Sequence, residues 1–348
     1  SNSLYVHDKK PSLLNTPFAG IWSIKYPNSI APIPRMGQFH YYDEENHRFY
    51  IGYGIDENNQ LMSDFWVLNT KDEQWNQIKL TGDLISGRVG SRCALVNDKL
   101  YIFGGFADNQ YFSDLHSIDI NTGIVNYIQT TGELPQSRTA PLVSHYNGNL
   151  YVWGGFNGEW PSSLHVLNLT SLEWKEIPQD LAGRITSPGV SIGNKYLTFG
   201  GSKSGGMVVL NFDENRIYLE QTSGNEPISS VLGSGMVLVN NYLFFFGGKS
   251  ASNWTLMYAC DTDRMWWFIF HVMPDGDTVS IADGSVNELG LFMLPRMHSF
   301  AVCYVKEKRE IVACLGHPMK DPPPLFCVNI AGALSVLHLR EDMLQMFP

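Results

Sequence analysis

The chain has 348 residues, of which 44% are hydrophobic and 13% aromatic, so it is long and apolar enough to build a large core. Its net charge is −10, from 34 acidic and 24 basic residues, and it has no run of lysine and arginine, so nucleic acids and anionic membranes are excluded as favoured partners. No apolar stretch is as long as a membrane-spanning helix requires, and residues 1–11 do not resemble a signal peptide.

An apolar run that ends in a glycine pair, or in a degraded version of one, recurs along the chain. The copies end at Gly54, Gly105, Gly155, Gly201, Gly248 and Gly316. Subtracting successive positions gives spacings of 51, 50, 46, 47 and 68 residues. A period of this length predicts a propeller with one insertion before its last unit. Each unit must pack against its neighbours, because none could bury its own apolar faces.

Each unit carries the signals of short antiparallel strands. Polar pairs such as Asn97-Asp98 and Asn147-Gly148 precede the glycine run and suit a tight turn between a first and a second strand. A third apolar stretch follows a variable loop and ends on a short polar residue. Six positions further on, the first five units have a large apolar residue that predicts a fourth strand: Trp75, Val125, Trp174, Ile217 and Trp267.

These elements predict an all-β, six-bladed propeller with four antiparallel strands per blade. We expect one domain over residues 1–348, with blades at residues 33–80, 87–131, 138–178, 184–222, 230–272 and 296–340. Residues 20–26, around Trp22, stand at the distance before the first unit that suits the outer strand of the last blade. A competing segment, residues 334–339, has Ser335 at the tryptophan position, so the N-terminal strand is the predicted closure.

The glycine pair, the aromatic residue before it and the tryptophan after the polar residue together resemble the kelch repeat. The resemblance covers roughly residues 20–340 and implies a kelch β-propeller in which the first strand of each blade is innermost. Kelch propellers include scaffolds, ubiquitin-ligase substrate receptors, cytoskeletal proteins and a few enzymes. The fold alone therefore does not select a function.

The cysteines bear on the cellular compartment and on metal binding. Cys93, Cys260, Cys303, Cys314 and Cys327 form no short-spaced pair, and their apolar surroundings favour free thiols and a cytoplasmic protein. Sequons at Asn168 and Asn253 point the other way, but Asn168 holds a turn position of the repeat. The last three cysteines with His317 lack the spacing of a structural zinc site, so we predict no metal and no cofactor.

Arginines recur at the entrance to the first strand of all units but the fifth. They are Arg35, Arg88, Arg138, Arg184 and Arg296. The kelch resemblance implies that they surround the mouth of the central channel. Arginine binds carboxylate or phosphate through two parallel hydrogen bonds, so the ring could bind an acidic partner. Alternatively, each guanidinium caps backbone carbonyls in its own or the next blade.

The loops after the glycine pairs are rich in aromatic residues and share a face with the arginines. The candidate partner-binding residues on these loops are Phe106, Tyr111, Phe156, Trp160 and Trp254. Large aromatic side chains on loops serve either as blade packing or as binding anchors. Trp160 and Trp254 are off the repeat register, which favours the anchor role for these two.

Two functions fit this pattern. The first is a non-catalytic protein-interaction module, a scaffold or substrate-recognition domain that binds a protein or an acidic or phosphorylated peptide at the arginine-ringed mouth. The second is a kelch-type enzyme acting on a small anionic substrate there. The iron-ligand pattern that kelch-like plant nitrile-specifier proteins carry, a Glu, an Asp and a His at four-residue steps, is missing from the sequence, so we expect a protein without catalytic activity.

An insertion before the last unit, residues 272–294, has no counterpart in the other units. Its first half is acidic, but the carboxylates lack the spacing of a calcium loop. Because it joins a fourth strand to the next first strand, we expect it on the face of the arginines. The sequence thus predicts a lid over the channel mouth, with Phe292 and Met293 packed on neighbouring loops.

Overall fold

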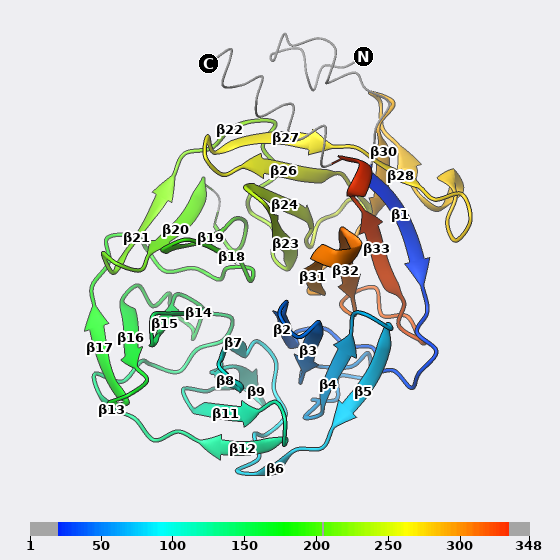
Figure 1. Cartoon of the computed structure of the whole chain (residues 1–348). Helices are drawn as coiled ribbons and strands as arrows, with labels where there is room; N and C mark the ends of the chain where they lie inside the picture. Colours follow the sequence, from blue (N-terminus) through cyan, green and yellow to red (C-terminus); the bar gives the residue numbers. More distant parts are fainter. Residues whose placement is uncertain (1–19, 204, 334–348) are drawn as a thin grey trace.

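The structure is a computed structural model that describes residues 20–203 and 205–333. Its sheets are arranged radially around a central channel, with the N-terminal strand beside the last sheet of the chain (Figure 1). In each of the larger sheets the strand that comes first along the repeat is innermost, and the fourth lies near the rim (Figure 1). None of the helices in these two ranges is long and apolar enough to cross a lipid bilayer.

The first half of the chain builds three of the larger sheets. One contains β2 (Phe39–Asp43), β3 (Arg48–Gly52), β4 (Phe65–Asn69) and β5 (Gln74–Ile78). The next contains β6 (Thr81–Gly82), β7 (Arg92–Val96), β8 (Lys99–Phe103), β11 (Leu115–Asp119) and β12 (Ile124–Tyr127). The third contains β13 (Thr131–Gly132), β14 (Leu142–Tyr146), β15 (Asn149–Trp153), β16 (Leu164–Asn168) and β17 (Glu173–Ile177).

The second half builds the other three larger sheets. One contains β18 (Val190–Ile192), β19 (Lys195–Thr198), β20 (Met207–Asn211) and β21 (Arg216–Glu220). The next contains β22 (Ser223–Gly224), β23 (Ser234–Val239), β24 (Tyr242–Gly247), β26 (Met257–Asp261) and β27 (Trp266–Phe270). The last combines β1 (Gly20–Lys25) and β28 (Val272–Pro274) with β31 (Ala301–Val305), β32 (Glu310–Cys314) and β33 (Leu325–Asn329).

Smaller elements complete the described structure. A three-stranded sheet joins β25 (Trp254–Thr255), β29 (Ser285–Val286) and β30 (Phe292–Pro295). A hairpin joins β9 (Phe106–Ala107) and β10 (Gln110–Tyr111), and two 3₁₀ helices are η1 (Ile281–Asp283) and η2 (Lys306–Lys308).

The predicted plan of six blades with four antiparallel strands each is wrong. Among the described residues, seven sheets have three or more strands, and four of the larger ones have five strands. The fifth strands are β6, β13, β22 and β28, and each pairs in parallel with the outermost strand of the repeat. These strands are only two or three residues long, so their apolar pattern is too short to be recognised in the sequence.

Three of the added strands depend on a glycine that the sequence repeats as Thr-Gly or Ser-Gly. Gly82, Gly132 and Gly224 have φ angles of +94°, +87° and +83°, in the left-handed region that favours glycine. A Cβ atom on them would lie 2.2–2.4 Å from the carbonyl oxygen of Val125, Trp174 or Trp267 in the neighbouring sheet. Because glycine has no side chain, the short strand that follows one sheet can pair with the outermost strand of the next sheet.

The N-terminal strand closes the ring, as predicted. β1 pairs antiparallel with β33, so that Trp22 lies opposite Val328. Trp22 is 2% exposed and its ring lies 5.5 Å from that of Phe326, centroid to centroid. Closure removes a sheet edge that could template aggregation. The competing segment, residues 334–339, lies outside the described residues.

The insertion does not form the predicted lid. Its first segment, β28, pairs with β1, and its last segment, β30, pairs with β25, so Figure 1 places it at the outer edge of the ring rather than over the channel. Asp275 N–H donates to the Trp22 carbonyl, and the ring of Phe292 packs 6.1 Å from that of Trp22. The insertion therefore covers the closing strand, because β1 would otherwise expose its outer edge.

The tryptophans of the fourth strands fill the space between sheets. Trp75, Trp174 and Trp267 are at most 3% exposed. Trp174, for example, packs with Phe103 and Leu150 in a cluster that joins the second and third of the larger sheets. Burial of such large side chains is the main apolar contribution to holding neighbouring sheets together.

Gly132→Ala should lower the free energy of unfolding more than Gly148→Ala does. Both glycines have positive φ, which costs an alanine roughly 1–2 kcal/mol. Only at Gly132 would the new Cβ also clash with a backbone oxygen, whereas nothing lies within 4 Å at Gly148. Urea unfolding of both variants measures the difference, and equal losses would show that the parallel pairing of β13 contributes nothing to stability.

Trp22→Ala should lower the free energy of unfolding by roughly 3–5 kcal/mol, because it removes a buried aromatic side chain from the closing strand. Ile21→Ala is the matched control, since Ile21 lies in the same strand and is 42% exposed. We expect the control to change stability by no more than about 0.5 kcal/mol. An unchanged thermal midpoint for Trp22→Ala would contradict closure by β1.

Candidate functional site

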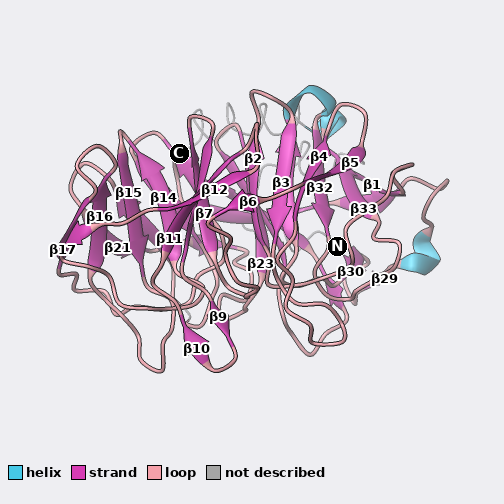
Figure 2. Ribbon diagram, turned by 90° about the horizontal axis from the view of Figure 1, so that it is seen from below, coloured by secondary structure: helices cyan, strands magenta, loops and turns pink. Residues whose placement is uncertain are grey.

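The loops that follow the glycine pairs share one face of the ring with the loops that carry the arginines. Backbone bridges pair Val89 with Phe106 and Thr139 with Phe156. Each of these aromatic residues is therefore paired with the residue that directly follows a candidate arginine. The β9–β10 hairpin projects from this face (Figure 2). The face predicted from strand direction is therefore the one on which the two sets of candidate residues meet.

Four of the five candidate aromatic side chains form a continuous row across two adjacent units. The centroid distances are 4.9 Å from Phe106 to Tyr111, 6.1 Å from Tyr111 to Phe156, and 4.7 Å from Phe156 to Trp160. The planes are tilted or perpendicular to one another, which are favourable arrangements for aromatic pairs. We call these four residues the aromatic row.

The row ends in an exposed tryptophan with a cation over it. Trp160 is 40% exposed, and Lys203 Nζ lies 5.5 Å from the centroid of its ring. A lysine at this distance is attracted by the negative face of the indole. The fifth candidate, Trp254, lies in β25 of the three-stranded sheet and is not part of the row.

Two of the candidate arginines are buried and form ion pairs with aspartates. Arg35 is fully buried and binds Asp64 through both terminal nitrogens, with Nη2 2.9 Å from Oδ2. Arg88 is 3% exposed, and its Nη1 lies 2.6 Å from Asp114 Oδ1. The guanidinium of Arg88 also lies over the ring of Phe112, 3.7 Å from its centroid.

The other three arginines are held without a carboxylate partner among the described residues. Arg138 donates to the carbonyls of Gln136 and Gly154, and burial lowers its pKa to about 10. Arg184 is 4% exposed, and burial likewise lowers its pKa. Arg296 donates to the carbonyls of Gly247, Gly248 and Trp254. Arg138 and Arg296 thus cap backbone within the protein, whereas the buried Nε of Arg184 has no hydrogen-bond partner among the described residues. A contact of any of these arginines with a partner stays a prediction.

Comparison with known proteins places the chain in a family. Residues 12–191, slightly more than half of the chain, match the KLHDC2/KLHL20/DRC7 Kelch-repeats domain. The chain belongs to the kelch-repeat family. It is therefore a kelch propeller, a fold that commonly serves as a protein-interaction module.

Curated relatives match only part of the kelch chain. The rice (Oryza sativa subsp. japonica) tRNA wybutosine-synthesizing protein 2/3/4 is 32% identical over 98 residues, which is 28% of this chain. The fission yeast (Schizosaccharomyces pombe) Tip elongation aberrant protein 1 is 30% identical over 105 residues, which is 29% of this chain. Each match spans 9% of the relative's own length. These proteins share a segment of the propeller with this chain.

A solved structure supports the fold. The structure of YjhT superposes with a TM-score of 0.56 at 17% identity, over 83% of this chain and 97% of YjhT. At this level of identity the likeness concerns the arrangement of strands alone.

The three cysteines weighed for zinc share one apolar cluster, but they form no ligand group with His317 among the described residues. Cys303, Cys314 and Cys327 are buried in strands of one sheet, and burial raises the pKa of each thiol. His317 instead stacks on His298, with centroids 4.8 Å apart.

One group of potential metal ligands does come together at the closing seam. Oxygen or sulfur atoms of Glu73, Glu310 and Cys327 lie within 4.8 Å of one another. The ammonium group of Lys25 lies 3.1 Å from Glu310 and 3.4 Å from Glu73, and Lys308 lies 3.4 Å from Glu73. These two lysines supply the positive charge there, so the group joins β1 to its neighbours as an ion-pair network.

Sequence reasoning missed the acidic partners of the arginines and the polar residues inside the channel. The recurring Ser63-Asp64 and Ser113-Asp114, at the start of the third strand, were a usable signal. Arg92, the first residue of the innermost strand β7, follows Ser91 directly and was not distinguished from its apolar neighbours.

Asp64→Asn should lower the free energy of unfolding at pH 7 by about 3 kcal/mol, because it leaves the buried Arg35 without its carboxylate. Burial alone would raise the pKa of Asp64, but hydrogen bonds and charge from Arg35 outweigh it and hold that pKa below 3.8. A carboxylate with a lowered pKa stabilises the fold above its unfolded pKa, and the contribution is lost as pH falls through the folded value.

The deficit of Asp64→Asn should therefore stay constant between about pH 5 and 7 and shrink below about pH 4, as measured by urea unfolding across pH. Asp98→Asn is the control, because Asp98 is exposed in a turn and lacks an ion pair among the described residues. A deficit that does not depend on pH would assign the loss to packing rather than to the charge of Asp64.

Proposed function

We propose that this kelch propeller is a non-catalytic protein-interaction module, a scaffold or substrate-recognition domain, that binds a segment of a partner protein along the aromatic row. One observation carries the proposal: four aromatic side chains from two units form a connected row on projecting loops, and the row ends in the half-exposed Trp160. Aromatic residues on loops fixed by a rigid scaffold are typical anchors of protein interfaces.

The row is organised before any partner arrives. The hairpin β9–β10 holds Phe106 opposite Tyr111 in its pairing register, and Phe156 is fixed by its backbone bridge to Thr139. Binding therefore requires little ordering of these side chains, which lowers the entropy cost of association. Trp160 should contribute the most to the free energy of binding, because contact with a partner would remove its exposed apolar surface from water.

The charge near the row favours an acidic segment. Lys203 stands over Trp160 at one end of the row, so a carboxylate or phosphate on the partner could reach its ammonium group. Arg35, Arg88 and Arg138 are committed to backbone carbonyls and to Asp64 and Asp114, so we assign the partner's anion to the exposed end of the row, at Lys203, first. The partner segment would present an apolar side chain beside an acidic one.

The cysteines support the cytoplasmic location that we propose with this role. The five thiols are free, and four of them are buried. Free buried thiols are typical of proteins kept in a reducing compartment.

A photo-crosslinking amino acid at position 160 should capture the partner in a lysate of the source cells, whereas the same group at position 127 should not. Tyr127 is the matched control, since it is 53% exposed but lies in the outer strand β12. The captured protein is then purified and its affinity is measured. Trp160→Ala should weaken binding at least about tenfold, while Tyr127→Ala leaves it unchanged.

Neither Trp160→Ala nor Tyr127→Ala should change the thermal midpoint of unfolding, because both side chains are substantially exposed. Equal affinity of wild-type and Trp160→Ala protein for a partner captured at position 160 would contradict binding along the row. Lys203→Gln tests the charge separately, and its loss of affinity should vanish at high salt, where the attraction between exposed charges is screened.

A further inference from the structure

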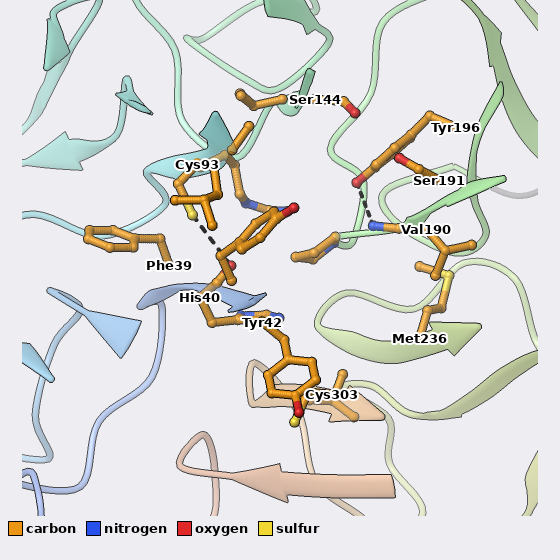
Figure 3. Close-up of a pocket in the computed structure, with 18 of the residues that line it drawn as sticks. Phe39, His40, Tyr42, Cys93, Ser144, Val190, Ser191, Tyr196, Met236 and Cys303 are labelled. Atoms are coloured by element: carbon orange, nitrogen blue, oxygen red, sulfur yellow. Dashed lines mark hydrogen bonds between the residues drawn. The ribbon is translucent and has the colours of Figure 1, made fainter. Parts of the chain in front are cut away.

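The central channel contains a cavity of about 400 Å³, a size that suits a small ligand. Its walls are the innermost strands, including β2, β7, β14, β18, β23 and β31, so every one of the larger sheets contributes (Figure 3). Figure 3 shows side chains of His40, Cys93 and Tyr196 gathered around the channel. The cavity is separate from the aromatic row, because none of the four row residues lines it.

A cation without a carboxylate partner lines this cavity. Arg92 lies at the start of β7, and its Nη2 donates one hydrogen bond to the carbonyl of Thr186, 3.0 Å away. Within the described ranges no carboxylate forms an ion pair with Arg92, whereas Arg35 and Arg88 each have one. Burial lowers the pKa of Arg92, but an arginine keeps its proton at neutral pH. A partly desolvated charge of this kind is costly unless an anion binds it.

The groups around Arg92 are neutral. Burial, and then the charge of Arg92, lower the pKa of His40 to about 4, so this imidazole is uncharged at pH 7. Burial raises the pKa of Cys93 to about 12, and it also raises the pKa of Tyr41 and of Tyr196. The site at this end of the channel therefore has one positive charge, surrounded by thiol and hydroxyl groups that keep their protons.

Two of the neutral groups have hydrogen-bonding capacity left for a ligand. Tyr196 accepts a hydrogen bond from Gly189 N–H at 2.6 Å, which leaves the phenol proton free to be donated. Gln38 is 8% exposed and donates to the Ser299 carbonyl, but its side-chain oxygen is buried and accepts no hydrogen bond from the described residues. A buried acceptor left in this way favours a ligand that carries a donor.

The acidic residue of the cavity stands away from the cation. Glu44 follows the last residue of β2, whereas Arg92 is the first residue of β7. The innermost strands all start on the arginine face, so Glu44 and Arg92 lie toward opposite ends of the channel. A strand of five residues spans about 16 Å, which keeps the carboxylate from neutralising the guanidinium.

We propose that the central cavity binds a small organic monocarboxylate, with its carboxylate on Arg92 and a hydroxyl or amide group near Gln38. The single charge of the site matches a monoanion better than a phosphate dianion, because the second negative charge would be buried without a partner. The planar guanidinium suits the two oxygens of a carboxylate. This site is independent of the proposed protein-interaction role, and its test uses neither the partner nor the aromatic row.

The test is calorimetric titration of the whole chain with sodium lactate, pyruvate and benzoate, and with inorganic phosphate as the dianionic probe. At least one monocarboxylate should bind with a stoichiometry of one, and more tightly than phosphate. Arg92→Gln should weaken that binding at least about tenfold, since a hydrogen bond to a charged group is lost. Arg216→Gln is the matched control, because Arg216 is exposed on the outer strand β21, stacked on Tyr218.

Unchanged affinity of Arg92→Gln, tighter binding of phosphate, or no binding of any of the three monocarboxylates would each overturn the proposal. If Arg92→Gln does not fold, a crystal structure of the wild-type chain with the tightest monocarboxylate decides the matter. Density for the ligand within hydrogen-bonding distance of Arg92 would support the site, and density elsewhere would overturn it.

Discussion

The ring depends on one repeated hydrogen bond at the junctions between neighbouring sheets. The N–H of the second residue in each glycine pair, or of its equivalent, donates to a backbone carbonyl at the entrance of the next unit. The donors are Gly54, Gly105, Gly155, Gly201, Gly248 and Gly316, and the acceptors are Arg88, Arg138, Arg184, Val231, Met297 and Arg35, at 2.7–3.0 Å. The bond from Gly316 to Arg35 joins the end of the repeat to its beginning. These glycines have positive φ angles, and a Cβ would crowd atoms at the entrance of the glycine's own unit, so glycine is required at the junctions.

The arginines and the insertion both reinforce this junction. Two of the arginines whose carbonyls accept the bond also donate from the guanidinium to the first glycine of the pair in their own unit: Arg88 to the carbonyl of Gly104 and Arg138 to that of Gly154. At the seam between chain ends, Lys25 adds ion pairs to Glu73 and Glu310. The insertion then covers the outer edge of β1 with β28. The junction between the two ends of the repeat thus has ion pairs and strand pairing in addition to the repeated hydrogen bond.

The sequence was sufficient to predict the propeller, its closure by Trp22 and the face on which the aromatic residues gather, because these follow from periodicity and strand direction. It was not sufficient for the fifth strands, since two residues such as Thr81 and Gly82 carry no pattern of their own and pair only once the next sheet is in place. The prediction of a lid was wrong for a similar reason. Strand order predicts where an insertion leaves the ring, but its direction is set by the pairing of β28 with the distant β1.

The arginines show why a recurring charged residue does not identify its own role. Arg35 and Arg88 have Asp64 and Asp114 beside them, and at the equivalent position in the third unit stands Ser163, so burial lowers the pKa of Arg138. All three guanidinium groups nevertheless donate hydrogen bonds to backbone carbonyls of the protein itself. Arg92 differs because it lines a cavity and, among the described residues, donates one hydrogen bond, to the carbonyl of Thr186. A cation is available to a ligand when the protein leaves its donors unused beside open space, and that property belongs to the folded ring rather than to any position in the repeat.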